Sequence, residues 1–216
     1  MSQELLEQAA ERYRAAGRTA HGFAKGKMAG DPAYLAVLAR LPAKGLLLDV
    51  GCGEGYLLAL ARAAQPGLSL HGVDHDERRV GQARRVLGQE SRLELVVADI
   101  REVPLPRAHV ITCLDVLHYM PAEQQDRTLE RLTGALEPDG VLFIRDGTSD
   151  GGLRSTLLRW SEQLAVALGR HRGDGVFFRP AQALRARLEA LGMRVEVAPC
   201  AEGTPFANLL WVASRG

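Results

Sequence analysis

A glycine-rich stretch preceded by a carboxylate is the part of this sequence best suited to holding a ligand. The apolar run Leu46–Val50 leads directly into the loop Gly51–Gly55, which reads Gly-Cys-Gly-Glu-Gly. This pattern predicts a buried strand, a tight turn and a helix start, with glycines where a ligand approaches the backbone or φ is positive. Dinucleotide-binding loops read G-x-G-x-x-G, whereas Tyr56 stands where the third glycine would be. The spacing disfavours nicotinamide chemistry, and Asp49 suits a ligand with a positively charged amino group.

Two more carboxylates follow predicted strands. Asp74 ends the second strand and can accept hydrogen bonds from both ribose hydroxyls. Asp99 follows the third strand and can accept from an adenine amino group. Each has a simpler alternative: Asp74 can cap the next helix, although Asp76 is available for that, and Asp99 can be an exposed turn residue. The glycines themselves can merely shape a turn, but the two aspartates at the carboxyl edge of the sheet favour a nucleotide-like ligand.

His118 is the candidate catalytic residue. It follows the fourth strand in the segment Cys113–Met120. An imidazole titrates near neutrality, so His118 can serve as a base that removes a proton from a hydroxyl group of a substrate. The alternative is that His118 only packs beside the ligand held by the glycine loop. Cys52 fills a position in the glycine loop where a small side chain suffices, and we expect no reactivity from it.

The elements that position these residues alternate between short apolar runs and helical patterns, which is typical of parallel strands joined by crossover helices. The sequence predicts an α/β fold whose last two strands form an antiparallel pair. The predicted strands are Leu46–Val50, Leu68–Val73, Leu93–Val97, Val110–Cys113, Val141–Ile144, Met193–Val197 and Asn208–Ala213, and the predicted helices between them are Tyr56–Ala64, Glu77–Leu87 and Ala122–Leu136.

The segments outside this core are expected to form a lid on the acceptor side. In front lie an amphipathic helix, a glycine-rich mobile loop over Gly17–Gly30, and a helix that begins at Asp31-Pro32. Toward the back we expect a helix over Leu153–Leu168 and a loop around His171. The predicted division is residues 1–44 for the N-terminal helices and lid loop, and 45–216 for the catalytic domain with an insertion at about 147–180. The candidate lid residues are Tyr13, His21, Phe23, Lys25, Lys27, Arg154, Trp160, His171, Phe177 and Phe178.

Composition narrows the class of protein. A chain of 216 residues that is 46% hydrophobic can bury one full core. The net charge of +1 gives no strong field for nucleic acid or an anionic membrane, so we expect neither as a partner. The three cysteines lack a C-x-x-C pair, which predicts no disulfide framework and no metal site. Met1–Arg14 has no apolar signal core and no stretch is long enough to span a membrane, so a cytoplasmic protein is expected.

Taken together, these residues resemble the class I S-adenosylmethionine-dependent methyltransferases. The glycine loop looks like that family's first motif, and Pro138–Leu142 looks like the turn that enters its fifth strand. The resemblance implies a Rossmann-like seven-stranded mixed sheet with helices on both faces. It also implies S-adenosylmethionine as the methyl donor and S-adenosylhomocysteine as the product. The cofactor-binding residues expected on this basis are Asp49, Gly51, Cys52, Gly53, Asp74, His75, Asp99, Ile100 and Leu114.

The acceptor is narrowed mainly by what the sequence lacks. The Asn/Asp-Pro-Pro-Tyr segment of amino-methylating branches is absent after the fourth strand, and Pro199-Cys200 is misplaced for cytosine chemistry. We expect methyl transfer, at oxygen rather than nitrogen or carbon, to a small-molecule or carrier-bound acceptor. The segment His21–Pro32 is similar to a run in methyltransferases of bacterial aryl-polyene pathways, which would imply a phenolic or aryl-polyene hydroxyl. Lys25 and Lys27 can meet an anionic group on such an acceptor or on its carrier protein.

Two alternatives from other classes remain open. One is a methyltransferase-like binding subunit that is catalytically silent on its own. The other is a nicotinamide-dependent oxidoreductase. The sequence does not set the oligomeric state.

Overall fold

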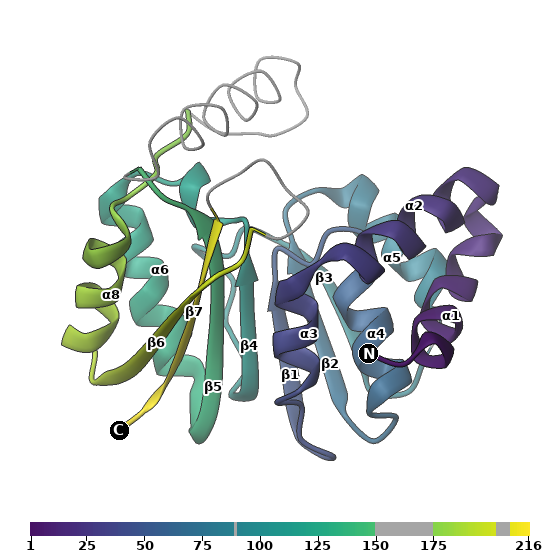
Figure 1. Cartoon of the computed structure of the whole chain (residues 1–216), viewed down its shortest axis with the longest axis horizontal. Helices are drawn as coiled ribbons and strands as arrows, with labels where there is room; N and C mark the ends of the chain where they lie inside the picture. The colour runs from purple at the N-terminus through teal and green to yellow at the C-terminus, as the bar shows by residue number, and fades with distance from the viewer. Residues whose placement is uncertain (89, 150–174, 202–207) are drawn as a thin grey trace. The chain divides into compact units, whose positions relative to one another are not determined.

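The computed structural model describes residues 1–88, 90–149, 175–201 and 208–216 (Figure 1). The helix expected over Leu153–Leu168, with Arg154 and Trp160, and His171 of the expected loop lie outside these residues. The chain divides into two compact units, Met1–Thr112 and Cys113–Gly216, and each is described separately below. The predicted division at residue 44 stays a prediction.

The first unit carries three parallel strands and the N-terminal helices. Strand β1 pairs with β2, and β2 pairs with β3, all in parallel. Strands β1 and β2 are buried along almost their whole length, as is usual for parallel strands inside a sheet. The helices are α1 (Gln3–Glu11), the 3-10 helix η1 (Arg12–Ala16), α2 (Arg18–Gly30), α3 (Pro32–Leu38), α4 (Tyr56–Ala64) and α5 (Glu77–Leu87), and the strands are β1 (Leu46–Val50), β2 (Ser69–Asp74) and β3 (Leu93–Val97).

Two helix starts in this unit follow the predicted capping chemistry. Asp31 caps α3, because its Oδ1 accepts a hydrogen bond of 3.0 Å from the Ala33 backbone N–H, and Pro32 occupies the first turn. Asp76 caps α5 by accepting from the backbone N–H groups of Arg78 and Arg79. Asp76, and not Asp74, is therefore the cap of α5.

The prediction of a mobile loop over Gly17–Gly30 is wrong, because Arg18–Gly30 forms helix α2. Low helix propensity is outweighed here by burial of one face: Ala24 and Met28 are both 0% exposed. A Cβ added at Gly22 or Gly26 would meet nothing within 4 Å, so these glycines are not needed for close packing. Helix α2 thus forms through tertiary contacts, which a count of glycines does not reveal.

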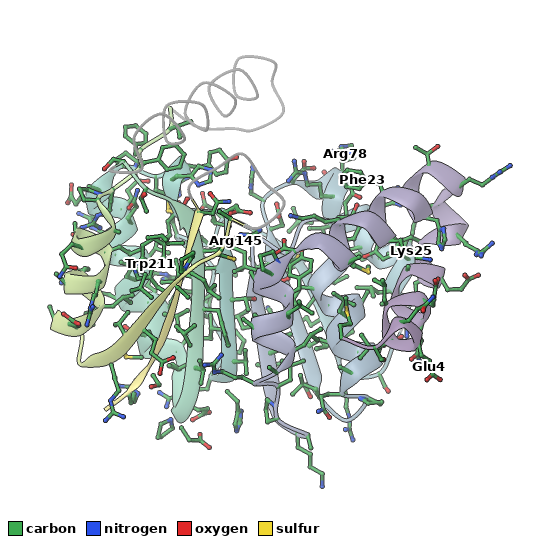
Figure 2. The ribbon with its side chains drawn as sticks, in the orientation of Figure 1. Glu4, Phe23, Lys25, Arg78, Arg145 and Trp211 are labelled. Carbon is green, nitrogen blue, oxygen red and sulfur yellow. The ribbon has the colours of Figure 1, made fainter. Side chains whose placement is uncertain are left out.

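The second unit is built on an antiparallel set of strands. Strand β5 pairs with β7, and β7 pairs with β6, as the predicted C-terminal strand pair requires (Figure 1). Trp211 on β7 is 1% exposed and lies in the core of this unit (Figure 2). The elements are the 3-10 helix η2 (Leu117–Tyr119), α6 (Ala122–Ala135), β5 (Leu136–Gly147), α8 (Ala181–Ala190), β6 (Met193–Pro199) and β7 (Asn208–Arg215).

The start of β5 differs from its prediction by five residues, because Val141 was the predicted first residue. A turn at Pro138-Asp139-Gly140 was expected to precede the fifth strand, but β5 begins at Leu136 and includes these residues. The fixed φ of proline is compatible with extended backbone, so the dipeptide Pro-Asp does not by itself enforce a turn.

Strand β4 (Ala108–Leu114) completes the sheet. The strand order is β3-β2-β1-β4-β5-β7-β6, which confirms the predicted seven-stranded mixed α/β sheet of Rossmann-like type. Among the described residues, no helix is both long and apolar enough to cross a membrane.

Candidate cofactor and acceptor sites

The glycine loop adopts the left-handed backbone that its sequence predicts. The φ angles are 79° at Gly51, 52° at Gly53 and 79° at Gly55. A Cβ at Gly55 would lie 2.9 Å from Cδ1 of Leu87, so close packing of α4 on α5 excludes a side chain there. A Cβ at Gly53 would meet nothing within 4 Å. The loop therefore leaves open space at Gly53, where a ligand can approach the backbone.

Hydrogen bonds from the end of β2 hold this loop in place. The backbone N–H groups of Gly51 and Cys52 donate to the Val73 carbonyl oxygen at 2.8 and 3.1 Å. The Gly53 N–H donates to Oδ2 of Asp74 at 2.8 Å. The loop conformation is thus fixed by contacts within the protein.

The Asp74 carboxylate accepts hydrogen bonds from two backbone N–H groups, those of Gly53 and Asp76, and can accept more. Its side chain is buried, with the residue 6% exposed, and its Oδ1 accepts from the Asp76 N–H at 2.9 Å. The imidazole Nδ1 of His75 lies 3.4 Å from the same oxygen. Each carboxylate oxygen has two lone pairs, so these bonds leave acceptor sites for ribose hydroxyls. The ribose role of Asp74 stays a prediction that the geometry permits.

Asp49 is a buried carboxyl at the end of β1. It is 4% exposed, and the Thr112 hydroxyl donates to its Oδ1 at 2.7 Å. Burial raises the pKa of Asp49 to about 7; the hydrogen bond from Thr112 lowers it and the charge of Asp74 raises it. A cationic amino group beside Asp49 would favour the ionised form. This carboxyl is therefore suited to receive a positively charged ligand group.

Asp99 lies beyond β3 and contacts a neighbour in the sequence. Its Oδ1 accepts from the Arg101 N–H and the Arg101 Nε, each at 2.9 Å. The hydrogen bond from the Arg101 side chain holds the pKa of Asp99 below its ordinary value, although partial burial opposes this. Ile100 is 7% exposed. The adenine contact proposed for Asp99 stays a prediction, since its carboxylate already pairs with Arg101.

The N-terminal helices contact the cofactor loop through aromatic side chains. The Tyr13 hydroxyl donates to the Glu54 carbonyl oxygen at 2.8 Å, and Tyr13 is 0% exposed. Burial raises the pKa of the Tyr13 phenol, which keeps it protonated as a donor. The Tyr56 ring centroid lies 5.0 Å from that of Tyr13 and 6.1 Å from that of Phe23. Phe23 is 63% exposed beside this cluster (Figure 2).

The two lysines predicted to meet an anionic acceptor group both pair with carboxylates of this chain. Lys25 bonds Glu7, and the Nζ of Lys27 lies 2.9 Å from Oδ2 of Asp31. These pairs tie α2 to α1 and to the start of α3. Neither lysine is positioned here as an unpaired cation for an acceptor.

Cys52, Cys113 and Cys200 are buried free thiols. Burial raises the pKa of the Cys52 thiol well above its ordinary value, which agrees with the expectation that it is unreactive. Within the described ranges, no group of three or more His, Cys, Asp and Glu side chains could hold a metal ion.

In the second unit, His118 is paired with a carboxylate that the sequence prediction missed. His118 lies in η2 and is 3% exposed, and Asp146 near the end of β5 is 5% exposed. Oδ2 of Asp146 accepts from the His118 backbone N–H at 2.9 Å, while its Oδ1 bonds the ring Nδ1. A carboxylate only accepts, so the ring proton belongs on Nδ1 and Nε2 carries the lone pair. The bond to Asp146 fixes the orientation of the His118 ring.

Aromatic side chains and a returning segment surround His118. Its ring centroid lies 4.1 Å from that of Tyr119 and 5.1 Å from that of Phe178. The Phe177 N–H donates to the His118 carbonyl oxygen at 2.7 Å. Nε2 of Gln125 donates to the Phe177 carbonyl oxygen at 2.8 Å. Of the predicted lid residues, Phe177 and Phe178 are therefore anchored next to the candidate base.

The acidic residue that directly follows β4, Asp115, is held by an ion pair. Asp115 has a φ of 58°, and its carboxylate pairs with the guanidinium of Arg145, including an Nε–Oδ1 bond of 3.0 Å. Arg145 is 5% exposed (Figure 2). Leu114, predicted to contact the cofactor, precedes this ion pair at the end of β4. Sequence reasoning could have found Asp146 and Arg145 by the same rule that found Asp74, because both lie near the carboxyl end of a strand.

Comparisons with known proteins agree with this geometry. A family model described as "Methyltransferase domain" matches residues 21–197. A curated relative, the carboxy-S-adenosyl-L-methionine synthase of Chromohalobacter salexigens, is 39% identical over 103 residues, which are 45% of this chain and 38% of the relative. The match thus spans well under half of that relative's length.

Two solved structures share the fold. The mitomycin 7-O-methyltransferase MmcR aligns with a TM-score of 0.67 and 23% identity, covering 96% of this chain and 60% of that one. The magnesium protoporphyrin IX methyltransferase of Synechocystis PCC 6803, solved with bound S-adenosylhomocysteine, aligns with a TM-score of 0.65 and 22% identity, covering 95% and 94%. At these identities the likeness shows the fold alone.

Proposed function

The chain belongs to the methyltransferase domain family and is an S-adenosylmethionine-dependent methyltransferase, and from this premise we propose that it methylates a hydroxyl group of a small or carrier-bound molecule. The observation that carries the proposal is the buried His118–Asp146 pair. A base of this kind is useful when the acceptor must lose a proton on methylation, as a hydroxyl does.

The residues at the carboxyl ends of β1 and β2 fit the cofactor. The open space at Gly53 and the left-handed loop admit a ligand close to the backbone. When bound, S-adenosylmethionine supplies an electrophilic methyl group on a sulfonium centre. We assign its amino group to Asp49 and its ribose hydroxyls to Asp74; Gly51, Cys52 and Gly53 line the approach, with His75, Asp99, Ile100 and Leu114 as the remaining predicted contacts.

The charge state of Asp49 contributes to this binding. A carboxyl with a pKa of about 7 is partly protonated in the free protein at neutral pH. A cationic amino group lowers that pKa by favouring the carboxylate, so ligand binding and loss of a proton from Asp49 are coupled. The Thr112 hydroxyl remains as a donor to the ionised group.

His118 is assigned as the base. Its Nε2 accepts the hydroxyl proton, and the positive charge that forms on the ring is stabilised by the Asp146 carboxylate on the other nitrogen. The backbone hydrogen bond to Asp146 fixes the position of η2, and so less reorganisation is needed during the reaction. General base catalysis of this kind contributes about 10²–10⁴-fold to a rate.

The aromatic surroundings of His118 support an aromatic acceptor. The rings of Tyr119 and Phe178 lie close to the imidazole and can pack against a flat acceptor ring. A phenolic or aryl-polyene hydroxyl, free or on a carrier protein, is the acceptor class that we favour. The aryl-polyene branch and a cytoplasmic location stay predictions. The family assignment gives no support to the nicotinamide alternative.

The test is methyl transfer by the purified full chain to a panel of phenols, carboxylic acids and amines. Formation of S-adenosylhomocysteine should occur with phenols and not with amines. The variant His118→Ala should lose turnover while keeping its affinity for S-adenosylhomocysteine. Equal turnover in His118→Ala, or methylation of amines alone, would refute the proposed O-methylation.

A further inference from the structure

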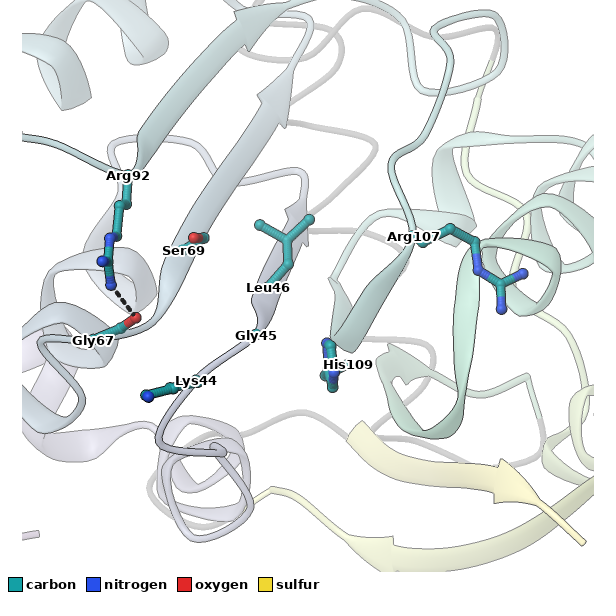
Figure 3. A pocket seen from close by; sticks show the side chains of 8 residues that line it. All are labelled: Lys44, Gly45, Leu46, Gly67, Ser69, Arg92, Arg107 and His109. Carbon is teal, nitrogen blue, oxygen red and sulfur yellow. Dashed lines mark hydrogen bonds between the residues drawn. The ribbon is translucent and has the colours of Figure 1, made fainter.

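A second pocket lies in the first unit, at the opposite ends of the strands from the cofactor residues. Its volume is about 520 Å³, within the range of small-molecule sites. It is formed at the amino ends of β1, β2 and β4 and by the loops that precede them (Figure 3). The lining residues are Lys44, Gly45, Leu46, Gly67, Ser69, Arg92, Arg107 and His109.

The lining of this amino-end pocket is basic. Lys44, Arg92, Arg107 and His109 are four of its eight residues, and none of the eight is acidic. Within the part of the chain that the structure describes, no carboxylate forms an ion pair with Lys44, Arg92 or His109. This contrasts with the acidic carboxyl ends of β1 and β2. The uncompensated positive charge favours an anionic ligand.

Two glycines that line the pocket, Gly45 and Gly67, leave no room for a Cβ atom. Gly45 has a φ of 117°, and a Cβ there would lie 2.7 Å from Nδ1 of His109. A Cβ at Gly67 would lie 2.9 Å from the Ala43 carbonyl oxygen. The His109 ring therefore rests directly against the Gly45 backbone, and its Nδ1 is buried without a hydrogen-bond partner among the described atoms.

A buried arginine behind the pocket holds its walls together. Arg62, which is 8% exposed, donates to the carbonyl oxygens of Pro66 at 2.7 Å, Leu68 at 2.9 Å and Arg92 at 3.2 Å. Arg92 in turn donates from Nη1 to the Gly67 carbonyl oxygen at 2.9 Å (Figure 3). The loop before β2 and the loop before β3 are thus connected by fixed hydrogen bonds. Such support positions the cationic groups before any ligand arrives.

We propose that the amino-end pocket binds the diphosphate group of a small molecule. Guanidinium groups form charge-assisted hydrogen bonds with phosphate oxygens, and a lysine adds a compact positive charge. The small volume of the pocket and the net charge of +1 favour a small ligand over a nucleic acid. The site is separate from the proposed methyl transfer and does not depend on it.

The experiment measures binding of ADP and of inorganic pyrophosphate to the full chain by isothermal titration calorimetry, with and without saturating S-adenosylhomocysteine. The test variant is Lys44→Gln/Arg92→Asn, in which asparagine suits the left-handed φ of 69° at Arg92. Arg78→Gln, at an exposed arginine on α5, is the matched control (Figure 2). Both probes should bind, and the double variant should bind them about tenfold or more weakly, since each charged hydrogen bond is worth about 1.5–3 kcal/mol.

The control should bind the probes like the unaltered chain, and all three proteins should keep the same S-adenosylhomocysteine affinity. The proposal would be overturned by absence of saturable binding, by equal affinity in the double variant, by an equal loss in Arg78→Gln, or by displacement of pyrophosphate by S-adenosylhomocysteine, which would place the anion in the cofactor site. Tighter binding of a duplex DNA through Lys44 and Arg92 would also overturn it, in favour of a nucleic acid.

Discussion

Replacing Asp146 by asparagine should slow methyl transfer without weakening cofactor binding. The carboxylate of Asp146 accepts from both the backbone and the ring of His118, and both residues are almost fully buried. Asparagine keeps the shape of the side chain, but its amide group can donate to the ring. Where the amide donates, Nδ1 of His118 becomes an acceptor and the proton moves to Nε2, which cannot then act as a base. Where the amide oxygen accepts from Nδ1, the ring can still act as a base, but without the negative charge of the carboxylate beside it.

The size of this effect follows from the lost hydrogen bond to a charged group. The imidazolium that forms during the reaction loses one charge-assisted bond, worth about 1.5–3 kcal/mol, which corresponds to a fall in kcat of about 10–150-fold. Asp139→Asn changes an exposed aspartate on the same strand and is the matched control. Its kcat should equal that of the unaltered chain.

The assay follows S-adenosylhomocysteine formation at saturating S-adenosylmethionine with a phenolic acceptor, and calorimetry gives the affinity for S-adenosylhomocysteine. Thermal unfolding shows whether Asp146→Asn remains folded. A kcat within about twofold of the unaltered chain would refute the reasoning, since it lies well below the loss expected for one charged bond. A parallel loss of cofactor affinity would also refute it, because the pair would then act through the fold.

Four further predictions concern the first unit. S-adenosylhomocysteine affinity should rise as pH increases through about 7, where the buried Asp49 ionises, and calorimetry should find no such rise in Asp49→Asn. The raised pKa also means that Asp49 costs the free protein stability as pH rises from the ordinary carboxyl range through about 7, so Asp49→Asn should raise Tm more at alkaline than at acidic pH. Asp74→Ala should weaken S-adenosylhomocysteine binding by about 1.5–3 kcal/mol for each bond lost, and unchanged affinity would exclude the ribose role. Gly26→Ala should raise the free energy of unfolding in denaturant by about 0.5–1 kcal/mol, because Gly26 lies in a helix with open space around it. Gly55→Ala should lower it, because Gly55 has a φ of 79° and a Cβ there would collide with α5. A lower free energy of unfolding in Gly26→Ala would argue against helix α2.

Local patterns in the sequence were enough to predict the central sheet. The bounds of β1, β3, α4 and α5 agree with their predictions, because β1 and β3 are short, mostly apolar runs and because α4 and α5 are helical repeats that begin after Gly55 and Asp76. The glycine loop was also predicted correctly, since the φ > 0 positions coincide with its glycines. Features that depend only on residues close together in the sequence could therefore be predicted.

Features that depend on distant residues were missed. Helix α2 was predicted as a loop because its stability comes from burial of Ala24 and Met28, not from its own propensity. The partner of His118 was missed because Asp146 lies on a different strand, β5, and only the fold brings the two together. The basic lining of the amino-end pocket likewise comes from three separate places in the chain, before β1, before β3 and at the start of β4.

The bonds of Asp74 to Gly53 and Asp76 affect the thermodynamics of cofactor binding as well as its geometry. Fixing one backbone residue costs about 1–2 kcal/mol of conformational entropy. Because Asp74 already restrains the loop in the free protein, this cost is met during folding and not on binding. The Asp74 carboxylate would therefore contribute to cofactor affinity in two ways. It would contact the ribose, as proposed, and it restrains the glycine loop before the cofactor binds. A substitution at Asp74 should therefore make the entropy of cofactor binding less favourable, in addition to reducing its enthalpy.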